Sequence, residues 1–286
     1  MAVNELPILP PVLVTEAVRE ALVEDLGDLG DVTSAATIPH SAQARATFAA
    51  RKPGVLAGLP LAEATFREVD ASVSFESILH DGDRIAAGAV AAGVSGNARA
   101  ILAAERVALN YLCHLSGIAT ATAALVERVK HTKARILDTR KTTPGLRAFE
   151  KYAVRCGGGT NHRIGLYDAI LIKDNHIAVA GGVAKAIRAA RAASPRVKLE
   201  VEVASLDQLT EAMTEKPDIV MLDNMTLADM RAAVKEVAGR ALLEASGNIT
   251  LETVAAFAET GVDFISSGWI THSAPSLDLG LDVVVG

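Results

Sequence analysis

The chain has 286 residues, half of them apolar and only 3% aromatic, with a formal net charge of −6. This length can bury a sizeable core in one large domain or two. The acidic chain has no basic run, so we expect no nucleic-acid binding, which needs clustered Lys and Arg. Residues 1–11 carry no signal-peptide pattern, and Pro, Gly or charge interrupts each apolar stretch, so we expect no membrane association.

The cysteine content indicates the cellular compartment. The only two cysteines, Cys113 and Cys156, are far apart and outside any metal-ligand spacing, so they predict neither a disulfide framework nor a zinc site. We therefore expect a cytoplasmic protein in a reducing environment.

The first part of the chain mixes helical and alternating patterns. In order, these predict a helix over 12–26, a loop over 27–33, a strand over 44–50, a short helix over 61–69 and turn-linked strands over 73–94. There are too few alternating strand and helix units for a parallel sheet. We expect a separate N-terminal α+β sandwich domain over residues 1–115, to which residues 276–286 return.

The second part of the chain is regular. Two long helices, over 97–113 and 118–130, precede six strand-like runs that alternate with helical ones. The predicted strands are 135–137, 169–172, 199–203, 219–222, 241–244 and 264–265, and the predicted helices are 146–154, 183–193, 206–213, 227–237 and 251–259. This alternation predicts an α/β fold with an incomplete (β/α) barrel over residues 116–275.

Polar residues follow each predicted barrel strand, where the chemistry of such barrels is located. The residues at these strand ends are Arg140, Lys141, Lys173, Glu202, Asp223, the turn Ser246-Gly247-Asn248, and Gly268. His162 and Arg163 lie in the loop between the first two strands. In a protein of net negative charge, this local excess of basic groups predicts a polyanionic small-molecule substrate.

Three of these residues allow more than one chemical role. Lys173 could form a Schiff base if desolvated, but with other basic groups nearby a fixed cation for an anionic substrate is the preferred interpretation. Glu202 and Asp223 follow consecutive strands, so we expect them to converge. Such a pair could bind magnesium, hydrogen-bond sugar hydroxyls or stabilise a developing positive charge.

A phosphate site is predicted at the late strands. The small residues of the Ser246-Gly247-Asn248 turn precede a helix expected to start near Thr250, whose exposed amides would bind phosphate. Gly268 follows the next strand, as in the phosphate sites of related barrels. His272 is either part of this site or a surface residue. His162 and His176 lack partners at ligand spacing, so no zinc site is predicted.

Several motifs together resemble the quinolinate phosphoribosyltransferase family, over a match that runs from Gly27-Asp28 to near the C-terminus. They include Ala104-Glu105-Arg106, His114-Leu115-Ser116-Gly117, Asp138-Thr139-Arg140-Lys141-Thr142, Asn161-His162-Arg163, Ile172-Lys173-Asp174-Asn175-His176, Leu222-Asp223-Asn224, Ser246-Gly247-Asn248-Ile249 and Thr271-His272-Ser273. After Gly268, Trp269 and Ile270 stand where the family usually has smaller residues.

The resemblance implies a reaction and a role for each residue. In the family, quinolinate and phosphoribosyl pyrophosphate react with Mg2+ to give nicotinate mononucleotide, pyrophosphate and CO2, a step of NAD biosynthesis. Arg106, Arg140, His162 and Arg163 are then expected to hold the quinolinate carboxylates, and Lys141 and Lys173 to reach the donor. Glu202 and Asp223 would face the ribose and Mg2+, and Ser246, Gly247, Asn248 and Gly268 the 5-phosphate, with Thr139, Trp269 and Ile270 also at the substrate site. Lys141, Lys173, Glu202 and Asp223 are the expected catalytic residues.

Helix periodicity and the family resemblance predict different roles for Arg106. Periodicity alone favours an ion pair with a neighbouring acid, whereas the resemblance implies a homodimer in which Arg106 completes the active site of the neighbouring subunit. Alternatives for the whole protein are a nicotinate phosphoribosyltransferase, a Schiff-base aldolase using Lys173, and a non-catalytic relative. Arg106, Arg140 and Arg163 together favour a dicarboxylate acceptor, and the presence of Lys141, Glu202 and Asp223 disfavours the non-catalytic relative.

Overall fold

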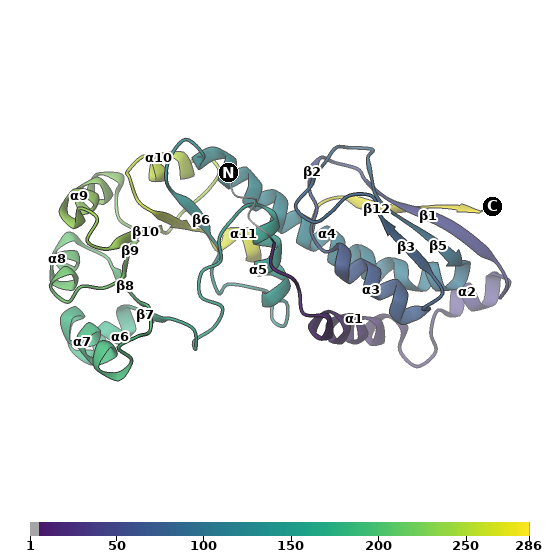
Figure 1. Cartoon of the computed structure of the whole chain (residues 1–286), viewed down its shortest axis with the longest axis horizontal. Coiled ribbons are helices and arrows are strands. Elements are labelled where there is room, and N and C mark those ends of the chain that lie inside the picture. Colours follow the sequence, from purple (N-terminus) through teal and green to yellow (C-terminus); the bar gives the residue numbers. More distant parts are fainter. Residues whose placement is uncertain (1–5, 286) are drawn as a thin grey trace. The chain divides into compact units, whose positions relative to one another are not determined.

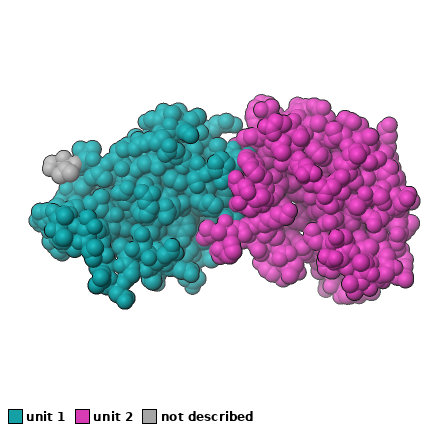
Figure 2. Space-filling view, turned by 180° about the vertical axis from the view of Figure 1, so that it is seen from behind, with its two compact units in different colours: residues 1–121, 149–158, 274–286 teal, residues 122–148, 159–273 magenta. Residues whose placement is uncertain are grey.

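The computed structural model describes residues 6–285 and divides into two compact units, coloured separately in Figure 2. One unit comprises Met1–Ala121, Phe149–Gly158 and Ala274–Gly286, and the other Thr122–Ala148 and Gly159–Ser273. The predicted division fell at residue 115/116 and left all of 116–275 in the barrel. Part of the segment 1–11, where no signal peptide is expected, and the end of 276–286 lie outside the described residues.

The first unit is built on an antiparallel sheet of order β12-β1-β5-β3. Residues of β12 pair with β1, so the C-terminal segment lies beside a strand more than 200 positions earlier in the sequence. The strands are β1 (Gln43–Ala50), β3 (Ser74–Ser77), β5 (Val90–Asn97) and β12 (Leu279–Val285), with a two-stranded sheet of β2 (Gly54–Val55) and β4 (Arg84–Ile85). The helices are α1 (Pro11–Leu26), α2 (Val32–Thr37), α3 (Leu59–Val69), most of α4 (Ala98–Val129) and most of α5 (Arg147–Cys156). The predicted loop over 27–33 therefore ends earlier, where Asp31 caps α2.

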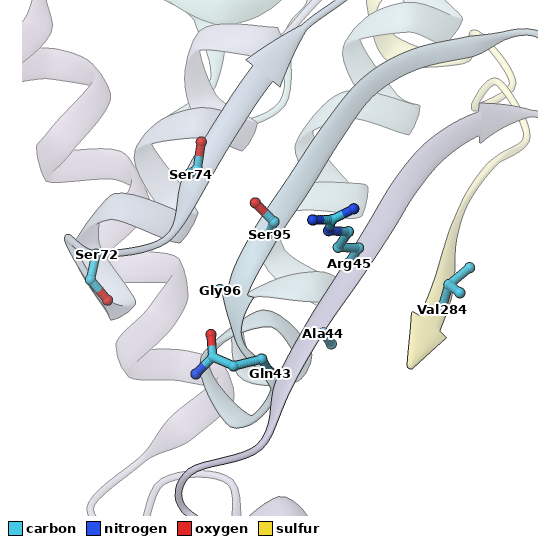
Figure 3. A pocket seen from close by; sticks show the side chains of 8 residues that line it. All are labelled: Gln43, Ala44, Arg45, Ser72, Ser74, Ser95, Gly96 and Val284. Carbon is cyan, nitrogen blue, oxygen red and sulfur yellow. The ribbon is translucent and has the colours of Figure 1, made fainter. Parts of the chain in front are cut away.

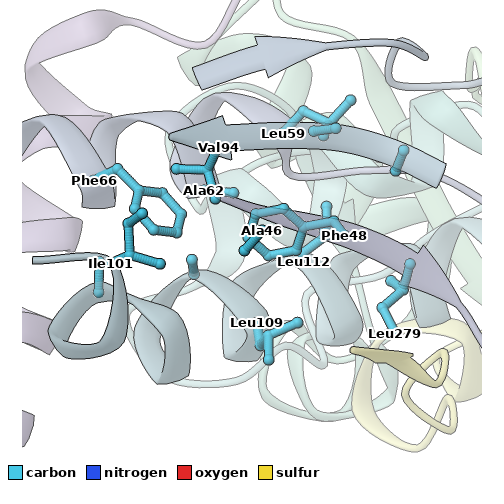
Figure 4. Close-up of a cluster of buried hydrophobic side chains, with 14 of the residues drawn as sticks. Ala46, Phe48, Leu59, Ala62, Phe66, Val94, Ile101, Leu109, Leu112 and Leu279 are labelled. Carbon is cyan, nitrogen blue, oxygen red and sulfur yellow. The ribbon is translucent and has the colours of Figure 1, made fainter. Parts of the chain in front are cut away.

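The core of the first unit is apolar and includes aromatic rings. Phe48 and Phe66 are fully buried, and their rings meet edge to face with centroids 5.9 Å apart. Ile101 and Leu112 of α4 are fully buried in the same cluster (Figure 4). Burying side chains of this size contributes roughly 1.5–3 kcal/mol each, so this cluster accounts for the stable sheet and helix pairing.

The helix α4 corrects one prediction, because the two helices expected over 97–113 and 118–130 form one continuous helix of 32 residues. Gly117 lies between the two predicted helices. A Cβ at this position would lie 2.3 Å from the carbonyl oxygen of Pro275, so glycine is required for close approach of another backbone. Its helix penalty of about 1 kcal/mol is accepted for that packing.

The continuous α4 also bears on the membrane prediction. Among the described residues it is one helix long and apolar enough to cross a membrane by length and composition, with 56% of that window buried inside the protein. The expectation that Pro, Gly or charge interrupts each apolar stretch did not anticipate this segment, because two separate helices were predicted there. Buried residues of α4 pack in the core described above.

The second unit is built on a parallel sheet of six strands, in the order β6-β11-β10-β9-β8-β7. The strands are β6 (Arg135–Leu137), β7 (Ile170–Ile172), β8 (Leu199–Val203), β9 (Ile219–Asp223), β10 (Leu242–Ser246) and β11 (Phe264–Ser266). All six predicted strands are confirmed to within two residues. In Figure 1 the helices α7 to α10 lie along the outer side of these strands. The predicted α/β fold with an incomplete barrel is confirmed.

The helices of the second unit agree less evenly with prediction. They are α6 (Asp174–Ala180), α7 (Val183–Ala193), α8 (Leu206–Thr214), α9 (Leu227–Val237), α10 (Val254–Ala258) and α11 (Trp269–His272). The helices α7 and α9 have the predicted bounds. The short helices α6 and α11 were not predicted, because each is too short to show a periodic pattern. The helix α10 starts later than expected, which matters for the predicted phosphate site.

An open groove of 890 Å³ lies on the first unit, over β1 and β5 (Figure 3). Its lining includes Arg45, Ser74, Ser95 and Val284. None of the predicted site residues lines it, so this groove is not the predicted active site.

Candidate active site

The sheet register places the predicted carboxylates on one face. Glu202 pairs with Met221, and Met221 in turn pairs with Glu244, so these three side chains point to the same side. Two residues further along their strands, Asp223 pairs with Ser246. Because side chains alternate along a strand, Glu202, Asp223 and Ser246 share this face at the C-terminal edge of the sheet. The expected convergence of Glu202 and Asp223 follows from this register.

Lys173 directly follows β7 and reaches the same face. Its Nζ lies 2.8 Å from Oε2 of Glu202, with the Lys173 side chain 46% exposed and that of Glu202 14% exposed. A Schiff-base lysine is activated by desolvation, whereas this amine is exposed and paired with a carboxylate. The geometry therefore favours the fixed cation over the Schiff-base lysine.

Asp223 is linked to the predicted phosphate turn through Asn224. The Nδ2 of Asn224 donates to Oδ2 of Asp223 at 2.9 Å, and the backbone N–H of Asn224 donates to the carbonyl of Ser246. The Nδ2 of Asn248 lies 3.4 Å from Oδ1 of Asn224. Gly247 has φ +103°, and a Cβ there would lie 2.1 Å from that same Oδ1. Asn224, which was quoted only as part of a motif, therefore packs against the turn and holds it through hydrogen bonds.

The Ser246-Gly247-Asn248 turn does not lead into a helix N-terminus, which corrects the prediction. The helix α10 starts at Val254 and has five residues. The hydroxyl of Thr250 accepts from the backbone N–H groups of Glu252 and Thr253, and that of Thr253 accepts from Thr250. These hydroxyls occupy the amides that a phosphate would need, since Thr side chains compete for backbone donors. The N–H groups of Gly247 and Asn248 themselves have no partner among the described residues.

Lys141, Gly268 and His272 form a second group on this edge. A Cβ on Gly268 would lie 2.9 Å from Cδ of Lys141 and 3.2 Å from Cδ2 of His272, so the lysine chain runs over the glycine. The hydroxyl of Thr271 donates to the carbonyl of Lys141 at 2.7 Å, and the hydroxyl of Thr139 accepts from its N–H. His272 thus lies beside the predicted phosphate site.

The two residues after Gly268 differ in exposure. The side chain of Ile270 is fully buried, whereas that of Trp269 is half-buried at the start of α11. Only the backbone of Ile270 is therefore available to a ligand at this edge.

Arg140 and Arg163 supply positive charge to the same unit. The Nε of Arg140 is buried and has no hydrogen-bond partner among the described residues. Desolvation, followed by the nearby charge of Arg140, lowers the pKa of Arg163, while the charge of Glu200 acts in the opposite direction. Two neighbouring guanidinium groups repel each other, so an anion is expected to bind between or beside them.

The loop that carries His162 and Arg163 is fixed by Asp138. This fully buried carboxylate accepts from the backbone N–H of His162 at 2.8 Å and from Nδ2 of Asn161 at 2.5 Å. Thr160 forms an isolated parallel bridge with Leu137 at the edge of the sheet. Asp138 and Asn161 were quoted as motif residues without a role, and the structure assigns them the positioning of this loop.

Glu200 and Glu244 were missed by the sequence analysis. Both lie inside strands and are buried, Glu200 at 4% and Glu244 at 0% exposure, on the same face as Glu202. The Nε2 of His162 lies 2.9 Å from Oε2 of Glu200 and 3.5 Å from Oε2 of Glu244. His162 has no partners at metal-ligand spacing in the sequence, but the fold brings Glu200 and Glu244 to its ring from distant strands. A carboxylate inside an apolar strand was the signal available in the sequence.

Arg106 lies in the first unit, on the exposed side of α4. It makes no ion pair with any residue that the structure describes, which disfavours the ion-pair interpretation from periodicity. Its expected role in a neighbouring subunit stays a prediction.

Comparisons with known proteins agree with the geometry of this edge. Residues 31–116 match the family model of the quinolinate phosphoribosyl transferase N-terminal domain, and residues 118–282 match that of its C-terminal domain. A protein of Mycobacterium leprae named nicotinate-nucleotide pyrophosphorylase (carboxylating) is 46% identical over 273 residues, covering 94% of this chain and 96% of its own. A mitochondrial quinolinate phosphoribosyltransferase (decarboxylating) of Nicotiana tabacum is 43% identical, covering 98% and 86%.

Solved structures give the same result. The NadC structure of Streptococcus pyogenes has a TM-score of 0.94 at 46% identity, covering 98% of this chain and 99% of that one. The nicotinate-nucleotide pyrophosphorylase of Francisella tularensis has a TM-score of 0.93 at 42% identity with the same coverage. By contrast, human nicotinic acid phosphoribosyltransferase is 14% identical with a TM-score of 0.62, which shows a shared fold alone. Both units, the site motifs and the close relatives agree, and the chain belongs to the quinolinate phosphoribosyltransferase family.

Proposed function

We propose that the C-terminal edge of the six-stranded sheet binds quinolinate at Arg140 and Arg163 and phosphoribosyl pyrophosphate at the Ser246-Gly247-Asn248 turn. The reaction is that of the family. The phosphoribosyl group passes from phosphoribosyl pyrophosphate to the ring nitrogen of quinolinate, and the adjacent carboxylate leaves as CO2. The products are nicotinate mononucleotide, pyrophosphate and CO2, in NAD biosynthesis.

One observation carries the proposed acceptor site. Burial lowers the pKa of Arg163 and the charge of Arg140 lowers it further, and the buried Nε of Arg140 has no partner among the described residues. Quinolinate brings two carboxylates, and guanidinium groups bind carboxylates through paired hydrogen bonds. A dicarboxylate therefore fits this pair better than the single carboxylate of nicotinate. His162, whose ring nitrogens face its own chain, would contribute to this end through its position beside Arg163.

The proposed donor site uses small residues and a flexible cation. Gly247 and Asn248 have φ +103° and +54°, and their N–H groups form a concave donor surface of the kind that binds phosphate. Lys141, which runs over Gly268, would meet the pyrophosphate or the phosphate from above. Trp269 and the backbone of Ile270 border this region. Thr139 orients Lys141 by accepting its N–H.

Glu202 and Asp223 would serve the ribose and Mg2+. Each has one oxygen engaged, by Lys173 and Asn224 respectively, and its other oxygen has no partner among the described residues. Magnesium is commonly held by one or two carboxylates together with substrate phosphates, so these two residues fit it. When bound, Mg2+ would neutralise charge on the departing pyrophosphate.

The chain's own residues account for the remaining steps. As the bond to pyrophosphate breaks, the ribose carbon gains positive charge, which the Glu202 and Asp223 carboxylates stabilise. Lys173, held by Glu202, and Lys141 would stabilise the leaving group. Once the ring nitrogen is alkylated, its positive charge stabilises the carbanion that loss of CO2 leaves behind. Arg140 and Arg163 retain the other carboxylate.

We further propose a homodimer in which Arg106 completes the partner's acceptor site. Its exposure on α4 and its lack of an ion pair among the described residues support this role. Subunit mixing tests it with two variants, Arg106→Ala and Lys141→Ala, each expected to be nearly inactive alone. Randomly mixed hybrids would regain about a quarter of wild-type activity, because half the dimers contain one intact site of two. No recovery after verified exchange would contradict the shared site.

A cytoplasmic location is also proposed, because both cysteines are unpaired thiols. The test is microscopy of the chain tagged at its C-terminus, with a marker for each compartment. An exclusively organellar signal would exclude it.

The activity is tested by following nicotinate mononucleotide and CO2 from purified protein, phosphoribosyl pyrophosphate and Mg2+ with either quinolinate or nicotinate. We expect product and CO2 from quinolinate alone. Turnover of nicotinate alone would contradict the proposed dicarboxylate site, and omission of Mg2+ with a chelator tests the proposed metal requirement.

A further inference from the structure

Glu200 and Glu244 are buried acids that the proposed reaction does not use. Both oxygens of Glu244 and Oε1 of Glu200 are buried without a hydrogen-bond partner among the described residues. The ring of His162 lies close to both acids. Its Nε2 is 2.9 Å from Oε2 of Glu200 and 3.5 Å from Oε2 of Glu244. Burying a charged carboxylate without partners is costly, so this cluster requires an explanation.

The other ring nitrogen fixes the proton on His162. The backbone N–H of Arg163 donates to Nδ1 of His162 at 2.8 Å, so Nδ1 is an acceptor and carries no proton. The proton of the neutral ring is therefore on Nε2, which donates to Glu200. The ring cannot become an imidazolium without losing the bond from Arg163.

The same argument excludes a metal ion at this cluster. One ligand atom each of His162, Glu200 and Glu244 lie within 4.8 Å of one another, a spacing that metal sites share. A metal would need the lone pair of Nε2, while Nδ1 is already an acceptor from Arg163. The ring would then have no proton at all, whereas metal-bound histidines usually donate from the second nitrogen.

The charges of the cluster then distinguish the two acids. Oε2 of Glu200 lies 2.9 Å from Nε2 of His162, and the charge of Glu200 opposes the lowering of the Arg163 pKa. Glu244 is fully buried and faces Glu200, the carboxylate of Asp138 and the hydroxyl of Ser266. Burial, followed by the charge of Glu200, raises the pKa of Glu244 well above its ordinary value. Of the two acids, Glu244 is therefore the one that carries a proton.

We propose that Glu244 is a positioning residue for the acceptor site, a neutral carboxylic acid that holds Glu200 against His162 and thereby fixes the ring on which the backbone of Arg163 rests. The inference depends on the proposed binding of quinolinate at Arg140 and Arg163. The chain of contacts runs from Glu244 to Glu200, to Nε2 of His162, and from Nδ1 to the N–H of Arg163. A loose ring would release the Arg163 backbone and misplace its guanidinium group.

The test compares two variants of nearly the same size. Glu244→Gln keeps a neutral side chain that can donate to Glu200, whereas Glu244→Met fills the space without a hydrogen bond. We expect wild-type kinetics for Glu244→Gln, and for Glu244→Met a quinolinate KM raised about tenfold, as for a lost hydrogen bond to an ionised group. The KM for phosphoribosyl pyrophosphate should stay unchanged. Glu259→Met, at an exposed His–Glu pair of the same unit, is the matched control.

A second measurement does not depend on activity. Ring nitrogen and proton NMR correlations should show His162 as the Nε2–H tautomer between pH 6 and 8 in the wild type and in Glu244→Gln. In Glu244→Met, we expect the His162 ring to exchange between its two tautomers or between two orientations.

Several outcomes would overturn the proposal. These are an Nδ1–H or imidazolium ring in the wild type, equal defects in Glu244→Gln and Glu244→Met, no defect in Glu244→Met, or equal increases in both KM values. The wild-type NMR result decides even if Glu244→Met does not fold. A wild type without quinolinate turnover but with the Nε2–H tautomer would instead contradict only the proposed function.

Discussion

Substitution of Gly247 by alanine should weaken binding of phosphoribosyl pyrophosphate selectively. The new Cβ would lie 2.1 Å from Oδ1 and 2.7 Å from Cγ of Asn224, far inside contact distance. Asn224 would have to move, and it is the residue that joins Asp223 to Asn248. The perturbation therefore reaches both the proposed phosphate turn and one carboxylate that faces the ribose.

The structure allows the size of this effect to be worked out. Gly247 has φ +103°, and an L-residue held in such a region costs about 1–3 kcal/mol. Moving Asn224 puts two hydrogen bonds at risk, each worth about 0.5–1.5 kcal/mol. If half of this total is lost from substrate binding, the KM for phosphoribosyl pyrophosphate rises by about tenfold or more.

The assay is initial-rate kinetics in each substrate, with Gly239→Ala as the control. Gly239 has φ +77° but nothing within 4 Å of a Cβ, so this variant carries backbone strain without the clash. We expect it to lose stability and to keep both KM values. In the double variant Gly247→Ala with Asn224→Ala, the clash with the amide disappears, so the two effects should be less than additive. An unchanged KM for phosphoribosyl pyrophosphate in folded Gly247→Ala would refute the reasoning.

Three further predictions concern buried positions. Gly117→Ala should lower the melting temperature, because the clash with the Pro275 carbonyl at 2.3 Å outweighs a helix-propensity gain of about 1 kcal/mol; a rise in calorimetry would contradict the packing. Burial, followed by the charge of Glu200, raises the pKa of Glu244 well above 4.5 in the folded protein. The free energy of unfolding of the wild type therefore falls as the pH rises from 4.5 toward the folded pKa. In urea titrations, Glu244→Gln should gain stability relative to wild type as the pH rises from about 5 to about 8. Burial raises the pKa of Cys156 to about 12, so native protein at pH 8 should resist iodoacetamide there by mass spectrometry, and rapid labelling would contradict this.

The strands of the second unit were predictable because each is a short apolar run that ends in a polar residue. The pattern at 199–203 and 219–222 contains the β-branched residues that favour buried parallel strands. Lys173, which directly follows the similar run at 169–172, lies at the edge of the sheet for the same reason. The order of the strands and the return of β12 to β1 involve contacts between distant segments, which no local pattern contains.

The errors in helix prediction have specific causes. The helices predicted over 97–113 and 118–130 form one helix, and the close approach of the Pro275 backbone requires glycine at Gly117 between them. At Thr250 and Thr253, hydroxyl groups replace helical partners for the backbone N–H groups, so the helix starts at Val254. Tertiary packing in the first case and side-chain competition in the second decide where the helix begins and ends.

The site residues at or next to the C-terminal ends of strands were found, whereas the acids deeper inside strands were not. Glu200 and Glu202 are two residues apart on β8, so they share one face, but only Glu202 follows enough of the apolar run to be noticed. Glu244 lies in the middle of β10 and is fully buried. A charged residue within a buried strand is seldom tolerated without a partner, and that rule would have singled out both acids.

The buried acids of the sheet bear on how the charge of Arg163 is tolerated near that of Arg140. Burial, followed by the charge of Arg140, disfavours the charge of Arg163, and Glu200 supplies the opposing charge. Were Glu244 also ionised, two buried negative charges would face each other with a single neutral imidazole between them. A proton on Glu244 removes that repulsion and leaves a single buried negative charge in the cluster. The arginine pair then keeps enough net positive charge to attract a dicarboxylate, which a second deep carboxylate would have cancelled.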